Sequence, residues 1–185
     1  MARSATLLMD LQVDFLAVDG GRMPVMPADA TRVIEAANAV LAGKSLKGTI
    51  PILVVNRFAS SDWMANLFRH NAAVEGKPGA ALDERVQAPD SVRLFAKRQP
   101  SAFTNADLDA YLKANEVSKI YVMGVFAEGC VRATALDAKR HGYDVAVPVD
   151  AVGTNADFKR RFAKWAMRRA GVQLLAALPV TANAT

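Results

Sequence analysis

Short apolar runs alternate with longer stretches of helical periodicity along this chain. The runs are rich in β-branched residues and are bounded by polar or turn residues, which is typical of strands buried in a sheet. The segments predicted as strands are Thr6–Met9, Ile50–Val55, Val92–Ala96, Ile120–Met123, Val145–Val147 and Val172–Leu175.

Between these runs, apolar residues recur with the period of an amphipathic helix. The expected helices span Asp29–Leu41, Gly129–His141 and Asp157–Ala170. A further helix is expected after Thr104, which forms a predicted capping box with Asp107.

Strands that alternate with helices predict βαβ units, whose right-handed crossovers place helices on both faces of a parallel sheet. The predicted fold class is α/β, a three-layer α/β/α sandwich with a five- or six-stranded, mainly parallel sheet. We expect residues 1–185 to form a single domain, because no repeat, low-complexity segment or Pro/Gly-rich linker divides them.

The segment Arg57–Ser91 is an irregular part of the pattern. It is long for a connection in a compact domain, and insertions of this kind tend to be lids, binding loops or contact surfaces. Within it, Trp63–Phe68 is predicted as a short helix.

Composition narrows the class of protein. The chain is 52% hydrophobic and 22% charged, which excludes a disordered tail, a collagen-like repeat and a disulfide-stapled miniprotein. Its single cysteine, Cys130, can form no internal disulfide, which favours a reducing compartment. The apolar run Ala5–Met9 is too short for a secretory signal or a membrane span, so we expect a soluble, cytoplasmic protein without a membrane partner.

Reactive side chains follow several of the predicted strands. Ligands of an open parallel sheet bind at the carboxyl ends of its strands. Asp10 follows the first strand, Lys97 follows Val92–Ala96, and Cys130 comes after Ile120–Met123 and a turn at Gly124. An acid, an amine and a thiol are therefore expected at one edge of the sheet.

Each of these residues also has a structural interpretation. Cys130 alone can be a buried, inert thiol, but a position between flanking glycines at the start of a helix favours a nucleophilic thiolate. Asp10 alone can cap a turn, and Lys97 alone can be a solvated surface group. Placed together, Lys97 would neutralise the carboxylate and stabilise the thiolate.

Three segments carry a resemblance to a known family. The segments are Asp-Leu-Gln-Val-Asp-Phe at Asp10–Phe15, Lys-Arg-Gln-Pro-Ser-Ala-Phe at Lys97–Phe103, and Gly-Val-Phe-Ala-Glu-Gly-Cys-Val at Gly124–Val131. In this order they resemble the motifs of the isochorismatase-like cysteine hydrolases, and the resemblance extends from about Thr6 to Leu175.

The resemblance implies a role for each member of the trio. Cys130 is the expected nucleophile, Asp10 the expected proton acceptor and Lys97 the expected cation. It also implies a non-proline cis peptide bond between Val125 and Phe126, and an oxyanion hole formed by the backbone N–H groups of Phe126 and Cys130.

The chain departs from the family pattern at two places. Many members have Thr-Asp where this chain has Ala127 and Glu128, which leaves the substrate contacts of the turn open. The nicotinamidase branch holds a metal through an Asp-x-His segment and a further His, but this chain has Asn56–Phe58 and Asp62–Met64, with only His70 nearby. We therefore predict the non-nicotinamidase branch, with no metal and no cofactor.

The expected activity is hydrolysis of a small amide or ureido C–N bond through a thioester intermediate. The predicted pocket walls are Phe15, Trp63, Phe103 and Phe126, although all four can equally be core residues. By the same resemblance, we expect a homo-oligomer.

Two other functions fit parts of the sequence. The same fold can hydrolyse the vinyl ether of isochorismate to give pyruvate, a reaction that does not need the thiol. A non-catalytic nucleic-acid binder or structural oligomer could use the basic helix Asp157–Ala170, in a chain of net charge +5. We instead expect Phe158, Phe162 and Trp165 of that helix to pack on the sheet, with its cations in solvent and no nucleic-acid partner.

Overall fold

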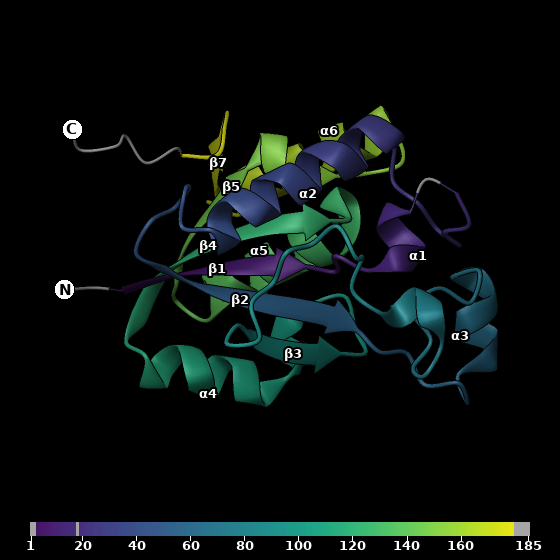
Figure 1. Cartoon of the computed structure of the whole chain (residues 1–185). Coiled ribbons are helices and arrows are strands. Elements are labelled where there is room, and N and C mark those ends of the chain that lie inside the picture. The colour runs from purple at the N-terminus through teal and green to yellow at the C-terminus, as the bar shows by residue number, and fades with distance from the viewer. Residues whose placement is uncertain (1–2, 18, 180–185) are drawn as a thin grey trace.

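The computed structural model describes residues 3–17 and 19–179, which build a parallel sheet between two layers of helices (Figure 1). The strands are β1 (Arg3–Met9), β2 (Thr49–Asn56), β3 (Arg93–Lys97), β4 (Val117–Val125), β5 (Asp144–Pro148), β6 (Val152–Gly153) and β7 (Gln173–Leu175). Their order is β3-β2-β1-β4-β5-β7, with β6 paired to β4, and all pairings between them are parallel.

The helices are α1 (Val13–Leu16), α2 (Pro27–Leu41), α3 (Trp63–Phe68), α4 (Ala106–Ala114), α5 (Arg132–Arg140) and α6 (Asp157–Arg169). Alternate residues of β1 face opposite layers, because side chains alternate along a strand. Leu7 packs in the core beneath α4, α5 and α6, whereas Leu8 packs in the core beneath α1 and α2. α3 lies at the end of the sheet toward which the strands point (Figure 1).

The three-layer α/β/α architecture predicted from the sequence is confirmed. Over the described residues the sheet has seven strands rather than five or six, because the two-residue strand β6 is too short to leave a hydrophobic pattern. The short helix predicted at Trp63–Phe68 is also confirmed.

The turn predicted at Gly124 is wrong, because β4 continues through this residue to Val125. Gly124 has a φ of 113°, and a Cβ atom there would lie 2.2 Å from the carbonyl oxygen of Met9 on the neighbouring strand. The glycine thus permits close approach of β1 and β4.

The predicted capping box before α4 is wrong by one residue. Asn105 is the N-cap, and its side-chain oxygen accepts the backbone N–H of Asp107 at 3.0 Å. The Thr104 hydroxyl instead donates to the carbonyl of Ser101 at 2.7 Å, within a preceding helical turn.

The aromatic residues of α6 do not pack on the sheet, contrary to the sequence prediction. Phe158, Phe162 and Trp165 are 70%, 50% and 56% exposed, and the core contacts of the helix come from Ala163 and Met167. α6 also packs closely against the turn that follows β4. No helix within residues 3–17 and 19–179 is long and apolar enough to cross a membrane.

Candidate active site

Four neighbouring strands bring polar side chains to one edge of the sheet. Asp10 follows β1, Asn56 and Lys97 are the last residues of β2 and β3, and Cys130 lies in the turn that follows β4. Because the strand order is β3-β2-β1-β4, these chain ends are adjacent, and Asn56 is paired directly with Lys97. The structure therefore brings together the acid, amine and thiol expected from the sequence.

Lys97 is the centre of this cluster. Its Nζ atom donates to Asp10 Oδ2 at 3.0 Å, to Asn56 Oδ1 at 2.6 Å and to Cys130 Sγ at 3.2 Å. The side chains of Lys97 and Asp10 are 0% and 1% exposed, so the ion pair is removed from solvent. Such a pair persists only where further hydrogen bonds satisfy both charges, and Asn56 provides one of them.

Asn56 is a member of the cluster that the sequence analysis did not identify. Its Nδ2 atom lies 3.8 Å from Cys130 Sγ, and its backbone is held by a reciprocal pair of hydrogen bonds to the side-chain amide of Gln12, both 2.9 Å long. The sequence did contain a signal for Asn56, because this polar residue comes at the end of an apolar run, as Asp10 does after β1.

The charges in the cluster are strongly coupled. Burial raises the pKa of Asp10 above its ordinary value of 3.8, although the Lys97 charge opposes this. For Lys97, burial disfavours the charged form, but the negative charges of Asp10 and Cys130 prevail and raise its pKa. Burial, followed by the Asp10 charge, raises the pKa of the Cys130 thiol to about 12.

These shifts indicate that Cys130 rests as a neutral thiol. Cys130 lies just before α5, where the N-terminus of a helix would stabilise a thiolate. The cost of burying a negative charge beside Asp10 outweighs that stabilisation. The resting cluster thus contains an ammonium group and a neutral thiol beside Asp10. Asp10 Oδ1 is buried and has no hydrogen-bond partner among the described residues, so it is free to accept a proton.

The segment Ala127–Val131 forms a single irregular helical turn between β4 and α5. The peptide bond between Val125 and Phe126 is cis. Within the described part of the chain, no carbonyl or side-chain acceptor receives a hydrogen bond from the backbone N–H of Phe126. Gly129 interrupts the turn with a non-helical conformation, φ −100° and ψ −108°, directly before the cysteine.

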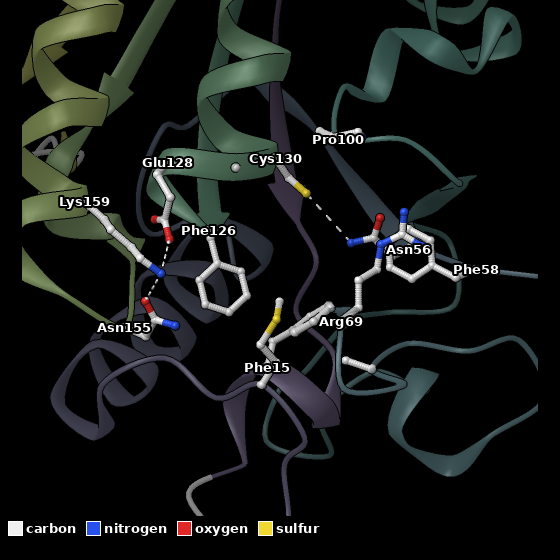
Figure 2. A pocket seen from close by; sticks show the side chains of 13 residues that line it. Phe15, Asn56, Phe58, Arg69, Pro100, Phe126, Glu128, Cys130, Asn155 and Lys159 are labelled. Atoms are coloured by element: carbon white, nitrogen blue, oxygen red, sulfur yellow. Dashed lines mark hydrogen bonds and ion pairs between the residues drawn. The ribbon is translucent and has the colours of Figure 1, made fainter. Parts of the chain in front are cut away.

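A cavity of about 240 Å³ opens beside the sulfur atom (Figure 2). Its apolar wall includes Phe15, Met23, Phe58 and Phe126, and its polar lining consists of Asn56, Arg69, Glu128, Cys130, Asn155 and Lys159. Asp10 and Lys97 lie deeper than this lining, so the thiol is the group of the trio that a ligand in the cavity meets first.

Two of the four predicted pocket aromatics line the cavity. Phe15 and Phe126 meet edge to face, with ring centroids 5.5 Å apart. The structure places Trp63 and Phe103 elsewhere. Trp63 is 69% exposed on α3, and Phe103 lies against His141, with the rings tilted and their centroids 4.7 Å apart, on the side of the sheet covered by α5.

Charged residues that the sequence analysis did not assign to a pocket stand at two opposite ends of the cavity (Figure 2). At one end, Lys159 Nζ donates to Asn155 Oδ1 at 2.8 Å and lies 3.6 Å from Glu128 Oε1. At the other end, the Arg69 guanidinium carbon lies 4.0 Å from the ring centroid of Phe58. Arg69 falls in the irregular segment, where no periodicity indicates which side chains turn inward.

The donor set does not fit a metal ion. Zinc-type centres take three or four His, Cys, Asp or Glu ligands. Over the described ranges, no group of three such side chains is close enough to hold a metal, and the only histidine near the cavity-lining segment, His70, is exposed.

Comparisons with known proteins give the evolutionary context. Residues 4–177 match the model of the Isochorismatase domain. A maleamate amidohydrolase from Pseudomonas putida is 30% identical over 152 residues, which cover 77% of this chain and 70% of that protein. An N-carbamoylsarcosine amidase from an Arthrobacter species is 29% identical over 109 residues, which cover 54% of this chain but only 41% of that relative. The crystal structure of pyrazinamidase of Pyrococcus horikoshii in complex with zinc has a TM-score of 0.81 and 27% identity, over 94% of this chain and 98% of that one.

Proposed function

The chain belongs to the isochorismatase family, a family of hydrolases, and on that premise we propose that it hydrolyses a small, non-peptide amide or ureido bond through a thioester on Cys130. The observation that carries this proposal is the position of Lys97 Nζ, 3.0 Å from the Asp10 carboxylate and 3.2 Å from Cys130 Sγ at the edge of the cavity. One buried cation, Lys97, thus holds both an acid and a sulfur atom. This arrangement suits proton transfer between Asp10 and Cys130 rather than a purely structural ion pair.

In the first half-reaction, Asp10 Oδ1 takes the proton of the Cys130 thiol as the sulfur attacks the carbonyl carbon of the substrate. The C–S bond forms, and the negative charge moves to the carbonyl oxygen. The backbone N–H groups of Phe126 and Cys130 are proposed to hold that oxyanion, and each such donor contributes about 2.7–4 kcal/mol of transition-state stabilisation. The unengaged N–H of Phe126 supports this assignment.

The collapse of this intermediate breaks the C–N bond, and Asp10 returns the proton to the leaving nitrogen. Ammonia or an amine departs, and the acyl group remains on Cys130 as a thioester. Asp10 then takes a proton from water, whose oxygen attacks the thioester carbonyl. The C–S bond breaks, and the proton on Asp10 restores the thiol. The Lys97 charge stabilises both the ionised Asp10 and the transient thiolate.

A screen of small primary amides and N-carbamoyl compounds, together with isochorismate, tests the function. We expect one or more of the amides to release ammonia. When the reaction is quenched with acid, the mass of the protein should be higher by that of the acyl group. The names of the relatives, an N-carbamoylsarcosine amidase and a maleamate amidohydrolase, support this choice of substrates. Pyruvate from isochorismate, with no ammonia from any amide, would replace the proposal with vinyl-ether hydrolysis.

The pH dependence of kcat/KM gives a second test. Asp10 must be ionised to take the thiol proton, and burial raises its pKa, so activity should fall on the acid side with a midpoint above 3.8. On the alkaline side, the Cys130 pKa of about 12 predicts no loss near 9.0, the ordinary value of a thiol. Circular dichroism at each pH separates protonation from unfolding, and an acid-side midpoint at or below 3.8 would contradict the role of Asp10.

We also propose that the protein is a homo-oligomer in the cytoplasm. The support is an exposed apolar surface on α3, where Trp63, Met64, Leu67 and Phe68 are 61–86% exposed, and a second on α6. The single cysteine agrees with a reducing compartment.

A further inference from the structure

Among the described residues, Arg69 is a cation of the cavity lining that has no ion-pair partner. Lys97 is neutralised by Asp10, and Lys159 lies 3.6 Å from Glu128. Arg69 forms no ion pair with any described residue, and its Nη1 atom is buried without a hydrogen-bond partner among them. A buried, unmatched guanidinium nitrogen is costly, so its persistence next to a ligand cavity points to a ligand that completes it.

The guanidinium is held in place before any ligand arrives. It stacks 4.0 Å from the centroid of Phe58, whose backbone pairs with that of Ala73 at 3.0 Å. The buried Asp14 carboxylate accepts the N–H of Ala73 at 2.8 Å, and Asn66 Nδ2 donates to the carbonyl of Ala59 at 2.8 Å. The segment that carries Arg69 is thus tied to its surroundings on both sides, which lowers the entropy lost on binding.

On the basis of the proposed function, we propose that Arg69 binds a carboxylate of the substrate, which makes the substrate an amide acid. The planar fork of a guanidinium matches the two oxygens of a carboxylate, and the Arg69 guanidinium lies over the Phe58 ring, 4.0 Å from its centroid. Figure 2 shows Arg69 on the Asn56 side of the cavity and Glu128 with Lys159 on the opposite side, with Cys130 between them. A carboxylate on Arg69 therefore places the remainder of a short substrate along the sulfur atom.

Matched substrate pairs test this assignment. Malonamate and succinamate are compared with malonamide and succinamide, which differ from them only by an amide in place of the carboxylate, and ammonia release gives kcat and KM. We expect the wild-type enzyme to favour the amide acids. Arg69→Gln should lower kcat/KM for them by roughly 10- to 100-fold, mainly through KM, and lower it far less for the diamides.

Two further variants separate charge from geometry. Arg69→Lys keeps the charge without the fork and should retain part of the preference. Arg161→Gln removes an exposed arginine of α6 by the same chemical change and should leave both substrate classes unaffected. If Arg69→Gln fails to fold, the comparison of Arg69→Lys with the wild type decides the same question.

Binding of the unreactive dicarboxylates malonate and succinate separates this inference from the proposed function. They should raise the melting temperature of the wild type and of Arg161→Gln but not of Arg69→Gln. If this pattern is seen while no amide is hydrolysed, the carboxylate site stands and the proposed function fails. Hydrolysis with equal preference for acids and diamides, or equal losses for both in Arg69→Gln, overturns the inference and leaves the function intact.

Discussion

Replacing Cys130 with serine is expected to lower kcat for amide hydrolysis by roughly 10³- to 10⁶-fold, the range seen when a covalent nucleophile is removed. The proton acceptor, the cation and the cavity all remain in this variant. What changes is the attacking atom, because a serine hydroxyl holds its proton far more tightly than a thiol and Asp10 is a weak base for it. Ammonia release under saturating substrate measures the effect.

The fold of Cys130→Ser should be intact, since the two side chains differ by a single atom and Cys130 is half-buried. The melting temperature and the far-ultraviolet circular dichroism provide this control. Because Cys130 is the only cysteine, intact mass after an acid quench gives an unambiguous second measurement. The wild type should carry an acyl group and the variant none. Undiminished ammonia release by the variant would eliminate the covalent mechanism.

The fold and the centre of the site were predictable because each depends on a local pattern. The β-branched runs indicate buried strands, and crossover geometry then fixes parallel strands with helices on both sides. Asp10 and Lys97 each end such a run, so topology alone brings them to one edge. The family match over residues 4–177 confirms the resemblance inferred from three short segments.

Other features depend on tertiary contacts that leave no local pattern. α6 places its aromatic residues in solvent because the small Ala163 is what fits against the neighbouring layer, and periodicity does not reveal which of two apolar stripes faces inward. Arg69 reaches the cavity from an irregular segment, which is fixed by a hydrogen bond from Ala73 to Asp14 and by the contact of Arg69 with the Phe58 ring. The pKa of Cys130 depends on its burial beside Asp10, which outweighs the local helix start.

Replacing Lys97 with methionine should destabilise the protein by about 3–5 kcal/mol at neutral pH, besides abolishing turnover. Methionine has a similar length and fills the same space, so the loss comes from charge rather than from a void. Asp10 would remain as a fully buried carboxylate without its ion-pair partner. Urea unfolding monitored by fluorescence measures the change in free energy of unfolding.

The pH dependence of this variant has a definite sign. Without the opposing charge of Lys97, the pKa of Asp10 in the folded state rises further above the 3.8 of the unfolded chain. The folded state then binds the proton more tightly than the unfolded state, so the stability deficit exists above the folded pKa and shrinks as pH falls through it. Unfolding of Lys97→Met at pH 5 should therefore show a smaller deficit relative to the wild type than at pH 7.

A double-mutant cycle isolates the ion pair from other effects of the substitutions. Asp10→Asn alone leaves the Lys97 ammonium buried without its carboxylate, and it should also be destabilised. Combining Asp10→Asn with Lys97→Met removes both charges, so the double variant should be more stable than Lys97→Met alone and should lose the pH dependence. If the two single losses simply add, the ion pair does not hold the cluster together. The convergence of strand ends would then be the sole organiser of the site.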